Sequence, residues 1–238
     1  MHNDLQFYKK HGWVHLQKKI SEDVVHELQT RSIKLRKWVN DKIGQPCKYG
    51  GDTHWKGVGC AGMYDTYLLD FYKSNLMIDI AKKLLNTEDV WLYNDQVVVK
   101  LPNDNFGFEE HTDNSIGGNF NEGGNTINMS VILTDFTDEN GTLQLRDTKI
   151  YPKAGDIVVI HGDTPHQSNP NKSDKPRCLY ACVYSDKQII FKNFYKERIV
   201  KSIIKKEDII NDIKEKIDDD RKKIIDDRKK IIDAKKEK

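Results

Sequence analysis

The feature that most constrains the fold is a series of short β-rich segments between about residue 90 and residue 185. Glycine, proline, asparagine and aspartate separate these segments, and such residues are typical of turns. The series does not alternate with helical patterns, as a parallel sheet would require, so it favours a mainly antiparallel sandwich or barrel. The segments are VWLYNDQVVVKL, TINMSVILTDF, GTLQL, DIVVIHG and RCLYACVYS.

Two segments that precede these strands have the pattern of helices. Residues 21–40 start with Ser21, a residue type favoured at the helix N-cap, and continue with acidic residues and a rough apolar face. Residues 67–86 predict a second helix, and residues 44–62 between the two are rich in glycine, which predicts a loop. Because the helices come before the strands, we expect them to pack against one face of a double sheet.

The composition changes again after residue 202. The segment 203–238 consists almost entirely of charged residues and isoleucine, and DDRKKII occurs twice in tandem with a seven-residue period. Such a period is typical of a coiled coil, but Asp220 and Asp227 stand where its seam would need apolar side chains. We therefore interpret the segment as a charged, low-complexity helical tail, with weak self-association through it as the alternative.

The length of 238 residues suits one large domain with an appendage. We expect a domain over residues 1–202, with a helical part (1–88) and a β core (89–202), and the separate tail at 203–238. The net charge of +2 gives no argument for nucleic acid or an anionic membrane. No segment has the pattern of a membrane span or signal peptide, and the four cysteines form no C-x-x-C pair, so we expect a cytoplasmic protein.

A histidine and an aspartate two residues apart, His111 and Asp113, indicate a metal site. Residues i and i+2 of a strand point to the same side, so the imidazole and the carboxylate can meet at one point. The pair alone is weak evidence, because a metal site needs a further ligand from another strand. The stretch from residue 155 to residue 177 predicts a strand, then a turn that contains His161 and His166, and then Arg177 at the start of the next strand.

Two histidines and one carboxylate on one face of an iron atom form the facial triad of non-haem Fe(II) oxygenases. Three protein ligands leave positions open for a bidentate 2-oxo acid and for O2. The far carboxylate of the oxo acid needs a fixed cation, and the planar guanidinium of arginine binds a carboxylate through two parallel hydrogen bonds. Arg177 follows the histidines after one short loop, where such a cation is expected.

The motifs EHTD, DENGTLQL, GDIVVIHG and HQSNPNKSDKPR occur in this order between Gln96 and Tyr184. Together with the opening FYKKHGWVHLQKKISEDVVHEL, they resemble the phytanoyl-CoA dioxygenase-like (PhyH) family of Fe(II)/2-oxoglutarate-dependent oxygenases. The resemblance covers residues 5 to about 190 and implies a double-stranded β-helix, a cupin-like jelly roll, with flanking helices. One segment, LQLRDTKIYPKAGD, is shorter than in relatives, so phytanoyl-CoA itself is not implied as the substrate.

The resemblance implies that three residues act in catalysis as the iron ligands: His111, Asp113 and His166. His166 is preferred to His161 because the H-x-S spacing and the distance to Arg177 both fit it. His161 is then expected to be a packed or supporting histidine.

The resemblance also implies contacts with 2-oxoglutarate. Arg177 and Ser168 match the pair that holds the C5 carboxylate of this cosubstrate. Gln96 and Ser130 fall on strand positions that touch it in the family, and Lys56 is a weaker candidate for its carboxylates. Two further features stay open. The loop 117–124 is either an active-site flap or a surface turn. The aromatic residues Trp55, Trp91 and Phe108 either line a pocket or fill the core.

The expected function is that of a dioxygenase that uses Fe(II), 2-oxoglutarate and O2. It would hydroxylate a small-molecule substrate, of an identity that the sequence does not give, and release succinate and CO2. Halogenation is not expected, because Asp113 fills the position that a halide would need. The alternatives are a metal-binding jelly roll that acts as a non-catalytic scaffold, and an oxygenase that acts on a macromolecule.

Overall fold

A computed structural model describes residues 2–43, 57–114 and 125–187. Lys56, Trp55, the loop 117–124 and the tail 203–238 lie outside these ranges, so the expectations for them stay predictions. Within the described ranges, no helix is both long enough and apolar enough to cross a membrane.

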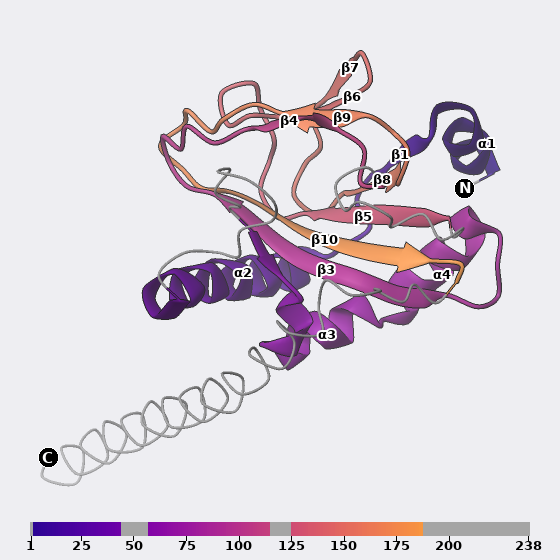
Figure 1. The fold of residues 1–238 in the computed structure, drawn as a ribbon, viewed down its shortest axis with the longest axis horizontal. Coiled ribbons are helices and arrows are strands. Elements are labelled where there is room, and N and C mark those ends of the chain that lie inside the picture. The colour runs from indigo at the N-terminus through magenta and orange to yellow at the C-terminus, as the bar shows by residue number, and fades with distance from the viewer. Residues whose placement is uncertain (1, 44–56, 115–124, 188–238) are drawn as a thin grey trace, which may run out of the picture. The chain divides into compact units, whose positions relative to one another are not determined.

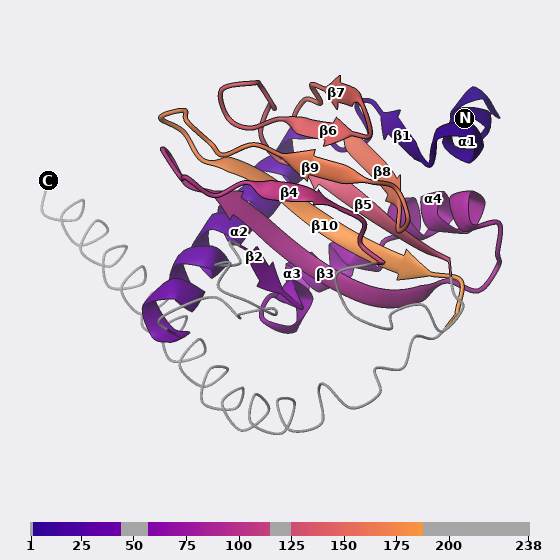
Figure 2. The same ribbon diagram turned by 45° about the horizontal axis from the view of Figure 1, so that its top comes forward.

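Two antiparallel sheets form the β core (Figures 1 and 2). The larger sheet has the order β1-β8-β5-β10-β3-β2 and the smaller sheet the order β4-β9-β6-β7. The strands of the larger sheet are β1 (Trp13–Leu16), β8 (Ile157–His161), β5 (Thr126–Ile132), β10 (Arg177–Ser185), β3 (Trp91–Lys100) and β2 (Gly57–Gly59). Those of the smaller sheet are β4 (Phe108–His111), β9 (His166–Ser168), β6 (Leu143–Leu145) and β7 (Thr148–Ile150).

Helices α2 (Glu22–Ile43), α3 (Thr66–Tyr72) and α4 (Asn75–Leu85) cover the face of the larger sheet that is turned away from the smaller sheet, and α1 (His2–His11) lies beside β1 (Figure 1). Successive residues of β3 show the two sides: Val97 and Val99 pack in the cluster that the helices share, whereas Val98 packs with Leu143 of β6. This alternation follows from the two-residue period of a strand. The described ranges also contain a short 3₁₀ helix at Ala61–Met63.

The predicted fold class is confirmed: a jelly-roll core with flanking helices on one side. The helix predicted from residue 21 is also confirmed, since α2 begins at Glu22 and the carbonyl of Ser21 accepts the first helical hydrogen bond from Val25. In contrast, the single helix predicted over residues 67–86 is wrong.

This predicted helix is two helices, α3 and α4, with a break at Lys73 and Ser74. Asp65 caps α3 by accepting hydrogen bonds from the backbone N–H groups of Tyr67 and Leu68. Ser74 has an extended backbone with ψ of 150° and starts α4 in a new direction. An apolar pattern of similar period runs through both helices, so the sequence pattern does not reveal the break.

Candidate metal and cosubstrate site

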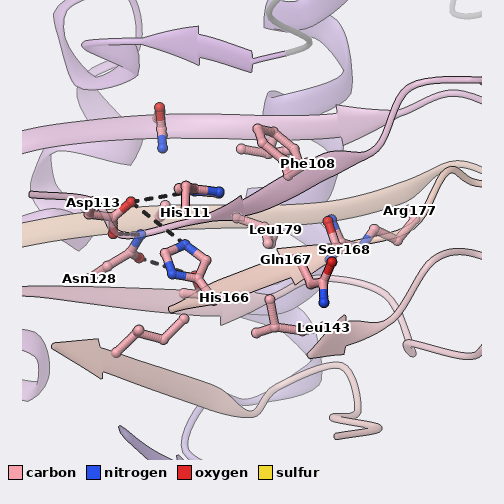
Figure 3. Close-up of a pocket in the computed structure, with 15 residues that line it drawn as sticks. Phe108, His111, Asp113, Asn128, Leu143, His166, Gln167, Ser168, Arg177 and Leu179 are labelled. Carbon is pink, nitrogen blue, oxygen red and sulfur yellow. Dashed lines mark hydrogen bonds and ion pairs between the residues drawn. The ribbon is translucent and has the colours of Figure 1, made fainter. Parts of the chain in front are cut away.

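The three predicted metal ligands come together at one end of the paired strands β4 and β9 (Figure 3). His111 is the last residue of β4 and lies opposite His166, the first residue of β9, with 4.2 Å between the ring centroids. Asp113 lies in the turn that follows β4, so the H-x-D motif extends past the strand end. Its Oδ1 is 3.7 Å from His166 Nε2 and 4.0 Å from His111 Nε2.

The ligand atoms of the three residues all lie within 4.8 Å of one another. Among the described residues they form the one such group of three or more histidines, cysteines or acids. His161 is not in this group; its Nδ1 instead accepts a hydrogen bond from the backbone N–H of Asp163 at 3.2 Å.

The protonation of both imidazoles suits a metal. His111 Nδ1 lies 2.6 Å from the carbonyl oxygen of Glu109, and His166 Nδ1 lies 3.0 Å from that of Thr164. A carbonyl only accepts hydrogen bonds, so each Nδ1 carries the proton and each Nε2 turns a free lone pair toward Asp113. Burial, and then the nearby His166, lower the pKa of His111, which favours the neutral, metal-binding form. Two neutral imidazoles and a carboxylate fit Fe(II).

Asp113 is held by a residue that the motifs do not include. Asn128 of β5 donates a hydrogen bond from Nδ2 to Asp113 Oδ2 at 3.0 Å, and its own Oδ1 accepts one from Ser130 Oγ at 3.1 Å. Ser130, a predicted cosubstrate contact, is therefore bonded to the residue that orients a predicted ligand. A polar residue two positions before Ser130 in an otherwise apolar strand is the sequence signal that could have identified Asn128.

Arg177 is buried without a counter-charge. It is 1% exposed, and its guanidinium carbon stacks 3.8 Å from the centroid of the Phe136 ring. Its Nε and Nη1 have no hydrogen-bond partner among the described residues. Burial lowers the pKa of Arg177 to about 9. An unpaired buried cation is costly, so these two donors indicate the binding site of an anion.

A second buried basic residue, Lys100, lies opposite Arg177 in the register of β3 and β10. Its Nζ is 2.8 Å from Ser168 Oγ and also contacts the carbonyl oxygens of Ser168 and Asn169. Burial, and then the charge of Arg177, lower the pKa of Lys100 to about 6. Neither Arg177 nor Lys100 forms an ion pair within the described ranges. The sequence motifs did not identify Lys100, because only the strand register brings it to Arg177.

One pocket between the two sheets connects the triad with the anion site. His166 and Ser168 are two residues apart on β9 and face the same side, a separation of about 6.6 Å. An extended five-carbon diacid spans a similar distance. The pocket is also lined by Gln96, whose side-chain amide has no hydrogen bond among the described residues, and by Phe108. Trp91 does not line it and is 43% exposed.

The model of the phytanoyl-CoA dioxygenase (PhyH) family matches residues 150–178. This stretch contains His166, Ser168 and Arg177. No curated protein matches the sequence. The resemblance predicted from the motifs is thus confirmed in the part of the chain that carries the second histidine and the buried arginine.

Several solved structures share the fold. The 2-oxoglutarate-dependent carbocyclase SnoK from nogalamycin biosynthesis has a TM-score of 0.67 at 19% identity, over 83% of this chain and 90% of that one. The epimerase SnoN, in complex with Fe3+, 2-oxoglutarate and nogalamycin RO, has a TM-score of 0.64 at 17% identity, over 78% and 83%. EctD from S. alaskensis, with 2-oxoglutarate and 5-hydroxyectoine, has a TM-score of 0.64 at 16% identity, over 77% and 75%. The names of SnoK and SnoN state different reactions, so the similarity to these structures establishes the fold but not the reaction.

Proposed function

We propose that this chain, which is PhyH-like in sequence and has the fold of 2-oxoglutarate-dependent non-haem iron enzymes, is an Fe(II)- and 2-oxoglutarate-dependent dioxygenase. The proposed reaction hydroxylates a small molecule and releases succinate and CO2. One observation carries the proposal: a single pocket has a His-Asp-His cluster at one end and a buried, unpaired arginine at the other. A metal scaffold without catalysis has no need of the second feature.

In this proposal, His111, Asp113 and His166 hold the iron through the two Nε2 atoms and one carboxylate oxygen. The bound iron supplies the activation of O2, which is coupled to the oxidative decarboxylation of 2-oxoglutarate. The fixed Nδ1–H bonds to the carbonyls of Glu109 and Thr164 keep both rings in the binding tautomer.

Arg177 and Ser168 would hold the C5 carboxylate of 2-oxoglutarate, and Lys100 joins them from the opposite strand. The paired N–H groups of the guanidinium fix the direction of the carboxylate, so the oxo acid end points toward the triad. Leu143, Leu179 and Val98 lie along the pocket between its two ends and exclude water from the methylene part of the diacid. Gln96 remains a proposed cosubstrate contact, and so does Lys56.

The choice of a small-molecule substrate is supported by the enzymes of the same fold, whose titles name nogalamycin RO and 5-hydroxyectoine as bound molecules. Hydroxylation is proposed over halogenation because Asp113 occupies the position that a halide would take. Product analysis in saturating chloride tests this: a halogenated product from the unmodified protein would contradict it. A cytoplasmic location also belongs to the proposal.

Succinate formation from 2-oxoglutarate tests the proposed function. The purified chain is reconstituted anaerobically with Fe(II), exposed to air with a panel of metabolites, and compared with His111→Ala. We expect slow succinate release without substrate, acceleration by the correct metabolite, and neither in the variant. No succinate above the variant under any condition would support the non-catalytic scaffold, and acceleration only by protein or nucleic acid fractions would support a macromolecular substrate.

A further inference from the structure

We propose that Asn128 is a positioning residue that holds Asp113 as a ligand through one oxygen only, and that Ser130 sets the orientation of Asn128. The inference rests on the proposed metal site. It concerns residues that lie outside the H-x-D, NG-x-L and H-x-S motifs.

The two partners differ in how firmly the backbone holds them. Asp113 lies in the turn after β4, outside the strand. Asn128 lies in β5, which is paired on both sides, so that Asn128 is opposite Ile160 of β8 and Val183 of β10. Its side chain is almost completely buried in the pocket wall. A rigid central strand therefore supports a carboxylate whose own backbone is in a turn.

The orientation of the Asn128 amide follows from its two partners. Ser130 Oγ donates to Asn128 Oδ1 at 3.1 Å, and Asn128 Nδ2 donates to Asp113 Oδ2 at 3.0 Å. With the amide reversed, its oxygen would face a carboxylate oxygen, and two acceptors would be in contact. The hydrogen bonds thus run in one direction, from Ser130 through Asn128 to Asp113.

This arrangement distinguishes the two oxygens of Asp113. Oδ2 is engaged by Asn128, whereas Oδ1 is the oxygen near both imidazole Nε2 atoms, at 3.7 and 4.0 Å. A carboxylate that binds with both oxygens would occupy one more position on the metal. Because the proposed chemistry needs positions for a bidentate oxo acid and for O2, a device that keeps Asp113 on one oxygen has a direct function.

The same geometry limits what Ser130 does. Its single hydroxyl proton is donated to Asn128, and 2-oxoglutarate, as a dianion, offers only acceptors. Ser130 can therefore either orient Asn128 or donate to the cosubstrate. We assign it to Asn128, so Ser130→Ala should affect metal binding more than the KM for 2-oxoglutarate.

Co(II) binding by the full chain tests the inference without catalysis. The dissociation constant of Co(II) and the absorption of the bound ion, which reports its coordination number, are measured for wild type, Asn128→Leu, Ser130→Ala and Ser130→Thr. Loss of such a supporting hydrogen bond typically weakens metal binding about 10–100-fold. We expect this loss and an altered spectrum in Asn128→Leu, a smaller loss in Ser130→Ala, and recovery in Ser130→Thr, which keeps the hydroxyl.

Thr126→Val is the matched control. Thr126 of β5 donates a hydrogen bond to Asn114, the neighbour of Asp113, at 2.8 Å, but contacts neither carboxylate oxygen. Thr126→Val should change the affinity for Co(II) by less than about threefold, whereas loss of a supporting hydrogen bond typically lowers the affinity about 10–100-fold. Wild-type affinity and spectrum in Asn128→Leu would overturn the inference; if that variant does not fold, equal affinities for Ser130→Ala and Ser130→Thr would overturn it. Wild-type protein that binds no Co(II) through His111 would instead refute the metal site, and with it the proposed function.

Discussion

At the scale of single residues, the buried basic residues decide what the pocket can bind. Arg177 lines this pocket, and its Nε and Nη1 have neither a hydrogen-bond partner nor a counter-charge in the described part of the chain. Arg177→Ala should raise the KM for 2-oxoglutarate about 100-fold, since a charge-assisted hydrogen bond to a buried partner contributes about 1.5–3 kcal/mol. Arg177→Lys should recover part of this loss, because a point charge lacks the paired N–H groups.

The measurement is the initial rate of succinate formation against 2-oxoglutarate concentration. The affinity of both variants for Co(II) is the control, and it should stay near the wild-type value because Arg177 does not touch the triad. A KM in Arg177→Ala equal to that of wild type would refute the role of this residue.

Lys100 gives a pH dependence whose sign follows from its surroundings. Its pKa is lowered to about 6, so above pH 6 the free amine is mostly neutral, and its Nζ–H donates a hydrogen bond to Ser168 Oγ. A bound carboxylate favours the ammonium form, so binding takes up a proton above pH 6. The affinity for 2-oxoglutarate should therefore fall as pH rises above 6, by up to about tenfold per pH unit.

Isothermal titration calorimetry in two buffers of different ionisation enthalpy measures this proton uptake directly. Lys100→Met keeps the length of the side chain but removes the titrating group, so uptake and pH dependence should both decrease. Binding to wild type with no proton uptake above pH 6 would show that Lys100 is already charged before the cosubstrate binds.

The residue types and spacing of the motifs were enough to predict the triad, Ser168 and Arg177, and the structure brings these residues to one pocket. Lys100 and Asn128 escaped prediction for a physical reason. Lys100 contacts Ser168 of β9, and Asn128 contacts Asp113 in the turn after β4. Each partner is distant in the sequence, and only the pairing of the strands brings it close. The sequence contains both residues but does not indicate which strands pair.

At the scale of elements, the longest segments were predicted best. The five β-rich segments each contain a strand, and α2 starts where its N-cap signal places it. The pattern did not identify α1, β2, β7 or β9. β2 at Gly57–Gly59 and the start of the 3₁₀ helix at Ala61 fall within residues 44–62, which were predicted as a loop. β7 and β9 have three residues each, too few for an alternating pattern to be recognised. His166 was expected in a turn and is instead the first residue of β9.

Gly141, in the NG-x-L motif before β6, gives an element-scale prediction. It has φ of +76°, and a Cβ at this position would lie 1.9 Å from the carbonyl oxygen of Asn169, in the loop that follows β9. The left-handed backbone alone costs a non-glycine residue about 1–2 kcal/mol, and the clash adds to this. Gly141→Ala should therefore lower the thermal midpoint clearly, as measured by calorimetry.

Gly59, the last residue of β2, is the matched control for Gly141. A Cβ there meets no atom within 4 Å, so Gly59→Ala should change the free energy of unfolding by less than about 0.5 kcal/mol. Equal midpoints for the two variants would show that the turn at Gly141 does not constrain the packing of β6 against β9.

At the scale of the whole molecule, both hydrophobic clusters of the described ranges are formed by residues that precede Ser185. Ending the chain after Ser202 should therefore leave the thermal midpoint and Co(II) binding unchanged, and alter at most the association state. Calorimetry, Co(II) titration and light scattering measure these three properties. A truncated chain that fails to fold, or loses Co(II) binding, would show that the segment 203–238 belongs to the catalytic domain.

In the proposed function, one pocket couples O2 to 2-oxoglutarate on a metal held by His111, Asp113 and His166. The most direct measurement is the mass spectrum of succinate formed by the Fe(II)-loaded chain under isotopically labelled O2. We predict one labelled oxygen atom in each succinate, and no succinate above background from Asp113→Ala. Unlabelled succinate, or labelled succinate formed equally well by Asp113→Ala, would contradict the account.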